Sequence, residues 1–326
     1  MKKLICLLLA ALMVIPFVFA SCGDEKAEPL KFGLGDYSTV SATDATEDAN
    51  GKGKVTITAA AVTVSAEGQI VDCVLDTADF TVEYTADGKA VANTSFATKR
   101  EQGDSYGMKA YAGATKEWYE QADAFAKVAC GKTLDEVKAL VVNADKGNDE
   151  VVNAGCTITV NEFVLAIEKA MNNAKVSETN VANDLKLGVY TEQTCKDADG
   201  DKNGQNKTET TFFASAIDAD GKVVAAATEC VQVAFTFDAN GKSTFDTTKA
   251  VSGKRELGDA YNMKAYGGAA KEWYEQADAF EALCIGKTAD EITALMGEDN
   301  YGNADVKAAG CTILVNGFVK AAGKIK

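Results

Sequence analysis

The sequence predicts an α+β protein made of two tandem duplicated domains, each a twisted antiparallel sheet with packed helices. The clearest observation is that residues 99–125 recur as residues 254–280, at an offset of 155, with 22 of 27 positions identical. In each copy, β-branched or alternating segments come first, and apolar residues at helical spacing follow. A site that belongs to the repeated unit should therefore appear twice at this offset.

Strand-like segments precede the repeated block in each copy. They are residues 54–64 and 69–75 in the first copy, and 208–217 and 231–237 in the second. Turn signals such as Asp87-Gly88 and Asn240-Gly241 follow them, as expected for antiparallel strands joined by tight turns.

Helical patterns occupy the rest of each copy. Residues 117–128 of the repeated block predict a helix that ends before Gly131, and short helices are expected around residues 134–140 and 289–295. Each copy then closes with a predicted helix whose apolar residues share one face. These are Val160, Phe163, Val164, Ile167 and Met171 in the first copy, and Val315, Phe318, Val319 and Ala322 in the second.

The N-terminus has the pattern of a secretory signal. Lys2 and Lys3 precede an apolar run over residues 4–20, and small residues precede Cys22. The segment Phe-Ala-Ser-Cys resembles a bacterial lipobox, so we expect acylation of Cys22, with an unmodified secretory signal as the alternative. The expected organisation is a lipoprotein signal peptide (1–21), a tether (22–31), a first domain (32–175), a linker (176–186) and a second domain (187–326).

The composition excludes several classes of function. A net charge of −15 argues against nucleic acid, whose phosphates require a basic surface. The chain has no histidine, which removes the commonest metal ligand and general base. Beyond Cys6 and Cys22, seven cysteines remain, and only Cys156 and Cys311 coincide at the offset of 155. We interpret the other five as small buried apolar residues, and we expect no disulfide framework.

A Gly-Cys-Thr tripeptide precedes the closing helix in both copies. It is Gly155-Cys156-Thr157 in the first and Gly310-Cys311-Thr312 in the second. Glycine allows a tight turn, and free N–H groups at a helix start suit an anion such as phosphate. The alternative is a helix start capped by threonine, with no ligand.

This arrangement resembles the covalent FMN-binding, or flavin-carrier, domain family. In that family a Ser/Thr-Gly-Ala-Ser/Thr motif after an acidic residue receives FMN as a phosphoester on its last threonine. The matching segments here are Ala-Gly-Cys-Thr at 154–157 and 309–312, with alanine in place of the first hydroxyl residue and cysteine in place of the alanine. The resemblance implies attachment at Thr157 and Thr312 by a flavin transferase.

The lipoprotein signal, the duplication and the Lys-Glu-Trp-Tyr-Glu-Gln block together resemble the two-flavin lipoproteins of Gram-positive extracellular electron transfer. The resemblance implies a protein lipid-anchored at the extracellular face of the cell membrane that carries two covalent FMN groups. Its partners would be a membrane electron donor and an extracellular acceptor such as ferric iron or a reductase. A cofactor-free ligand-binding or surface-interaction lipoprotein is the main alternative, and a substrate-specific flavin enzyme is a third.

The repeated block itself has two interpretations. As the wall of a flavin site, it would place aromatic rings and a cation beside the isoalloxazine. These residues are Met108, Lys109, Trp118 and Tyr119 in the first copy, and Met263, Lys264, Trp273 and Tyr274 in the second. As a packing helix, it would bury Trp118, Ala122 and Phe125 on one face.

Two other motifs are weaker. Thr115 ends a Gly-Ala-Thr segment, but its counterpart in the second copy is Ala270, so the repeat argues against a shared attachment site. The aspartate-rich run at 197–204 hints at a calcium loop, but Lys202 and Thr208 stand where an EF-hand needs glycine and glutamate. We interpret that run as a solvated loop.

Overall fold

The computed structural model describes residues 29–177 and 184–325. The predicted signal peptide, Cys22, most of the tether and the middle of the predicted linker lie outside the described residues.

Two antiparallel sheets form the centre of the molecule. The first has the order β4-β3-β2-β1-β5, and the second has the order β6-β7-β8. Their strands are β1 (Lys31–Thr43), β2 (Gly51–Val64), β3 (Ile70–Tyr84), β4 (Ala90–Val91) and β5 (Lys175–Val176), and then β6 (Asp184–Lys196), β7 (Gly204–Ile217) and β8 (Val223–Phe237).

Helices follow the strands in each repeat. In the first repeat they are α1 (Lys99–Gln102), η1 (Gly103–Tyr106), α2 (Met108–Tyr111), α3 (Trp118–Ala129), α4 (Leu134–Lys138), η2 (Asn143–Asp145), α5 (Asp149–Ala154) and α6 (Asn161–Asn173). In the second they are α7 (Lys254–Leu257), η3 (Gly258–Tyr261), α8 (Trp273–Cys284), α9 (Ala289–Thr293), η4 (Glu298–Asn300), α10 (Ala304–Ala309) and α11 (Asn316–Ala322). The predicted fold class is confirmed.

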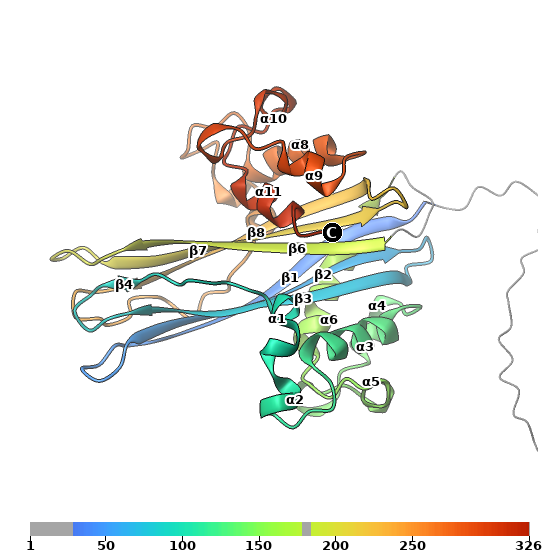
Figure 1. The fold of residues 1–326 in the computed structure, drawn as a ribbon, viewed down its shortest axis with the longest axis horizontal. Helices are drawn as coiled ribbons and strands as arrows, with labels where there is room; N and C mark the ends of the chain where they lie inside the picture. The colour runs from blue at the N-terminus through green and yellow to red at the C-terminus, as the bar shows by residue number, and fades with distance from the viewer. Residues whose placement is uncertain (1–28, 178–183, 326) are drawn as a thin grey trace, which may run out of the picture.

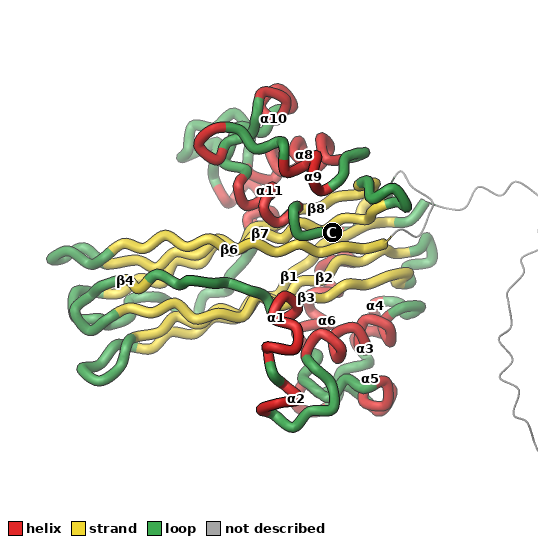
Figure 2. Tube along the Cα trace, viewed as in Figure 1, coloured by secondary structure: helices red, strands yellow, loops and turns green. Residues whose placement is uncertain are grey.

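The two sheets lie face to face, and each carries its own helices on the outer side (Figures 1 and 2). Successive side chains of a strand point to opposite faces of its sheet, so each sheet has one face toward the other sheet and one face toward its helices. In β2, Ile57 and Ala59 point into the core between the sheets, whereas Ala60 and Val62 point toward the helices. The predicted closing helices α6 and α11 bury the apolar faces that their spacing indicated.

Several strands are longer than the sequence indicated, and β1 and β6 were not predicted. Glycines interrupt the alternating pattern that would identify β1 as a strand, and the packing of β1 against α6 requires them. A Cβ on Gly35 would lie 2.2 Å from the backbone nitrogen of Ala170 in α6, and one on Gly188 in β6 would lie 2.0 Å from the carbonyl oxygen of Ala321 in α11. The β6 strand begins at Asp184, inside the predicted linker.

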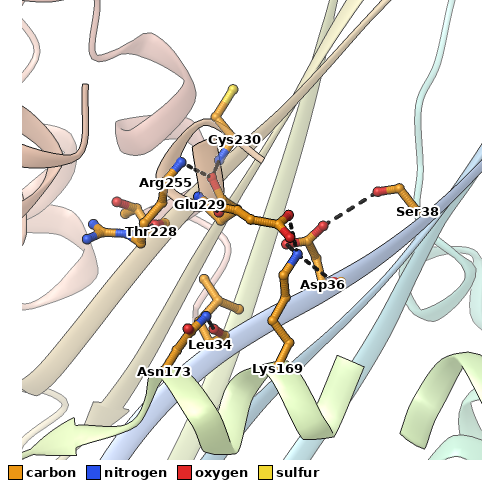
Figure 3. A network of polar contacts seen from close by, with 10 residues as sticks. Leu34, Asp36, Ser38, Lys169, Asn173, Thr228, Glu229, Cys230 and Arg255 are labelled. Carbon is orange, nitrogen blue, oxygen red and sulfur yellow. Dashed lines mark hydrogen bonds and ion pairs between the residues drawn. The ribbon is translucent and has the colours of Figure 1, made fainter. Parts of the chain in front are cut away.

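Charged side chains connect the two repeats where β1 and α6 meet β8 and α7 (Figure 3). Lys169 donates to Asp36 of its own repeat at 3.2 Å and to Glu256 of the other repeat at 2.7 Å. Glu229, which is buried, accepts the backbone N–H of Arg255 at 2.9 Å. The repeats therefore share both an apolar core and a polar contact.

This contact predicts that stability falls as pH rises from 5.5 to 8. Burial, followed by the charge of Asp36, raises the pKa of Glu229 from 4.5 to about 7, against the opposing effect of Arg255. Burial also raises the pKa of Glu281 to about 7. The folded state then holds protons that the unfolded chain releases, so the contribution to stability is complete below about pH 4.5 and is lost through pH 7.

Urea unfolding at several pH values measures this effect, and each unit of pKa shift corresponds to about 1.4 kcal/mol. Glu229→Gln should make the profile shallower, since the amide does not titrate, and Glu281 should account for the remaining slope. A stability that rises between pH 5.5 and 8 would contradict the prediction.

Candidate functional site

The Gly-Cys-Thr turn lies between two helices in each repeat. Gly155 ends α5 and Gly310 ends α10, with left-handed φ values of 98° and 99° that favour glycine. The closing helices begin further on, at Asn161 and Asn316. The prediction that the turn forms a helix start is therefore wrong, because the short helices α5 and α10 were not recognised.

The threonine of each turn is held by a buried glutamine. The Thr157 N–H and hydroxyl both donate to Oε1 of Gln121, at 2.8 and 3.1 Å. The Thr312 N–H and hydroxyl donate in the same way to Gln276, at 2.8 and 3.0 Å. Both threonines are exposed. Because the hydroxyl proton is committed to glutamine, both lone pairs of the threonine oxygen remain free.

The cysteine of each turn is buried, whereas the threonine beside it is exposed. Cys156 and Cys311 are fully buried in the helix–sheet core of their repeats. Burial raises the pKa of each thiol to about 11, so both are neutral at physiological pH. We therefore assign them to anchoring the turn.

A lysine lies against each turn. Lys116 Nζ donates to the carbonyl oxygen of Ala154 at 2.9 Å. A Cβ on Gly155 would lie 2.3 Å from this nitrogen, and one on Gly310 would lie 2.3 Å from Lys271 Nζ. Each glycine thus makes room for an ammonium group, which places positive charge beside the threonine.

A cavity between the outer face of the sheet and the helices lies next to each turn. The first has a volume of about 430 Å³ and the second about 490 Å³, within the range of roughly 300–1,000 Å³ typical of small-molecule sites. Thr312 itself lines the second cavity, and Ile158 and Thr159, which follow Thr157, line the first. Eight pairs of positions at the offset of 155 line both cavities, and six of these pairs hold the same residue type: Lys99 and Lys254, Tyr106 and Tyr261, Met108 and Met263, Trp118 and Trp273, Ile158 and Ile313, and Phe163 and Phe318.

The lysine of each cavity is paired with a carboxylate and lies near aromatic rings. Lys99 Nζ is 3.2 Å from Asp79 and 5.4 Å from the ring centre of Tyr106. Lys254 Nζ is 2.8 Å from Glu209 and 5.3 Å from the ring centre of Tyr261. Although burial alone lowers the pKa of Lys254, Cys230 and Glu209 raise it above its usual value, so this side chain is a cation.

Only some of the predicted wall residues reach the cavities. Met108, Trp118, Met263 and Trp273 line them. Lys109 and Lys264 do not, because they pair with Glu120 and Glu275 on the helix surface at 2.6 and 2.9 Å. Tyr119 and Tyr274 also do not, because their hydroxyls donate to Asp104 and Asp259, each at 3.1 Å. The lysines that line the cavities are therefore Lys99 and Lys254, rather than the Lys109 and Lys264 that the sequence indicated.

The repeated block therefore both packs and lines a cavity. Trp118, Ala122 and Phe125 are buried, as the packing interpretation predicted. Hydrogen bonds also join separate parts of the block, since the Glu117 carboxylate accepts the backbone N–H groups of Met108 and Lys109 at 2.8 and 3.1 Å. Glu272 does the same in the second repeat. The high identity of the block follows from these combined roles.

The remaining motifs lie elsewhere. Thr115 is exposed and is not among the residues that line the first cavity. Within the aspartate-rich run, Asp197 accepts the Ala90 N–H at 3.0 Å, and the described residues contain no cluster suited to a metal ion. The seven cysteines in the described ranges are free thiols; Cys195 is exposed and Cys130 half-buried, contrary to prediction, and the others are buried.

Comparisons with known proteins give one short similarity. The chain is 51% identical over 41 residues to a chlorophenol reductase of Desulfitobacterium hafniense, a match that covers 13% of this chain and 12% of that protein. No protein-family profile and no solved structure matches the chain. Among the helices of the described ranges, none combines the length and apolarity needed to cross a bilayer.

Proposed function

We propose that the protein is a membrane-anchored, extracytoplasmic electron carrier with one covalent FMN in each repeat. The observation that carries the proposal is the glutamine-held threonine beside an aromatic cavity that contains a lysine, present in both repeats. Thr157 and Thr312 would be the attachment points. Acylation of Cys22 would place the protein at the outer face of the membrane.

The residues around each turn fit a phosphate-linked flavin. Trp118 and Tyr106, or Trp273 and Tyr261, offer aromatic surface for a planar ring. Lys116 and Lys271 supply positive charge beside the threonine, where a phosphoester would carry negative charge. The sequence suggested that N–H groups at a helix start would face the phosphate; in the structure these two lysines would take that place.

Attachment requires an activated flavin. A transferase would supply a flavin dinucleotide, whose phosphoanhydride bond breaks as the threonine oxygen forms its bond to the FMN phosphorus. The nucleoside monophosphate would leave with the electron pair, and the threonine proton would pass to a base of the transferase. On this chain, Gln121 and Gln276 orient the oxygen, and the exposure of both threonines gives the transferase access.

The flavin supplies the redox chemistry when it is bound, and the protein sets its environment. Lys99 and Lys254 would stabilise negative charge on the reduced ring. The short similarity to a reductase supports a redox role. Electrons would pass from a membrane donor to an extracellular acceptor such as ferric iron or a partner reductase, and a covalent link would keep FMN from being lost outside the cell.

Mass spectrometry tests the proposal. The chain is expressed and exported together with a flavin transferase that modifies a known control substrate. We expect two FMN-sized mass increments that map to the peptides containing Thr157 and Thr312. An unmodified chain beside a modified control would contradict the carrier and favour a cofactor-free binding lipoprotein.

The glutamine contact makes a separate prediction. Gln121→Leu keeps the buried volume but removes the acceptor, so flavin attachment at Thr157 should slow by about 10- to 100-fold, as for a misaligned reacting group. A time course of intact mass measures the rate, and unaltered Thr312 in the same chain serves as the control. Gln121→Glu keeps an acceptor oxygen and should retain the rate. Equal rates at both sites in the Leu variant would contradict the assigned role.

A further inference from the structure

One tyrosine of the repeated block is almost wholly exposed in both repeats. Tyr111 is 89% exposed, and Tyr266, its partner at the offset of 155, is 88% exposed. The other two tyrosine pairs of the block are engaged, since Tyr106 and Tyr261 pack against the cores and Tyr119 and Tyr274 donate hydrogen bonds. A single exposed aromatic side chain is ordinary on a protein surface. An exposed tyrosine at the same position of both repeats, within a block of high identity, indicates a function.

The position of Tyr111 indicates that function. Tyr111 lines the mouth of the first cavity together with Met108 and Trp118. The Tyr111 N–H donates to Gly107, whose φ is 80°, at 2.8 Å. In the second repeat the Tyr266 N–H donates to Asn262, whose φ is 64°, at 3.1 Å. Glycine and asparagine are the residues that best tolerate this left-handed backbone, so the turn is preserved although its residue differs.

We propose that Tyr111 and Tyr266 close over the outer face of the ring system held in each cavity, opposite Trp118 and Trp273. This inference rests on the proposed flavin function. Trp118 and Trp273 are buried and line their cavities, whereas Tyr111 stands in solvent at the opening of the first cavity. Tyr266 is equally exposed at the equivalent position but is not among the residues that line the second cavity, so it would have to move toward the ring. A planar aromatic ligand would give the tyrosine ring the stacking partner it lacks. Stacking of the strength found between aromatic rings favours the closed arrangement by about two- to tenfold.

The test uses the full chain carrying a single flavin. In a Thr312→Ala background, where only Thr157 is modified, Tyr111→Leu should increase flavin fluorescence and its quenching by iodide by about twofold or more. Tyr266→Leu is the matched control and should change neither. Tyr111→Phe should retain protection from iodide, because the ring remains. In a Thr157→Ala background, the roles of the two tyrosines should reverse.

Two results would overturn the proposal. If Tyr111→Leu leaves fluorescence and iodide quenching unchanged in a chain of flavinylated mass, the tyrosine does not cover the ring. The same unchanged values with slower electron transfer to a partner would instead assign the tyrosine to partner docking. If the unaltered chain lacks the FMN mass increment, the carrier proposal itself fails, and circular dichroism of each variant separates these outcomes from misfolding.

Discussion

Replacing Thr157 with alanine is expected to remove one of the two proposed flavins and to leave the other in place. Thr312→Ala should have the reciprocal effect, and the double variant should carry no covalent flavin. The effect is all or none because the threonine oxygen is the atom that would form the bond to phosphorus. Intact mass and peptide mapping of chains exported with the transferase give the result directly.

Nearby hydroxyls provide the controls for this prediction. Thr115 is exposed but is not among the residues that line the first cavity. Thr159 lines that cavity, but the equivalent position in the second repeat is Leu314, which has no hydroxyl. Alanine at either position should leave two flavins. Loss of a flavin in the Thr115 variant with retention in the Thr157 variant would contradict the assignment from the repeat.

Replacing Lys254 with methionine is expected to lower the reduction potential of the flavin at Thr312. The Lys254 ammonium group is buried in the second cavity beside Glu209. Its replacement should remove a charge interaction with the reduced flavin of about 1.4–2.8 kcal/mol. For a two-electron couple this corresponds to about 30–60 mV. Redox titration of the Thr157→Ala chain, which keeps only the second flavin, measures the shift without overlap.

The matched control is Lys264→Met in the same background. Lys264 belongs to the same repeated block, but it is exposed and paired with Glu275 outside the cavity, so the potential should stay constant. A shift in the Lys264 variant with none in the Lys254 variant would restore the assignment made from the sequence. Lys99→Met in the Thr312→Ala background repeats the test for the first repeat.

The conformation of the Gly-Cys-Thr turn shows where local sequence ceases to be sufficient. The glycine and threonine were identified from the offset of 155, since each occurs in both repeats. The helix preceding Gly155 was missed because α5 has only six residues and one buried apolar side chain, Val151. A segment this short has little helical preference of its own and is fixed by its cap and its packing.

The cation of the cavity shows the same limit. Lys99 lies 19 positions before Trp118 in the sequence, whereas Lys109 is close to it. The structure nevertheless brings Lys99 to 5.8 Å from the Trp118 ring centre. The buried Asp76 of β3 makes this possible, since it accepts the Arg100 N–H at 3.2 Å and so fixes the start of α1 against the sheet. A contact between segments that are distant along the chain leaves no periodic signal for sequence reasoning to find.

The duplication, the α+β class, the buried faces of α6 and α11 and the paired threonines followed from the sequence alone, because they depend on periodicity and on the repeat. The tertiary structure decided which residues gather around each threonine. Gln121, Lys116 and Lys99 converge there from separate elements, as Gln276, Lys271 and Lys254 do in the second repeat. It also decided that the two sheets share one core, since strand alternation identifies a buried face but not the surface that covers it.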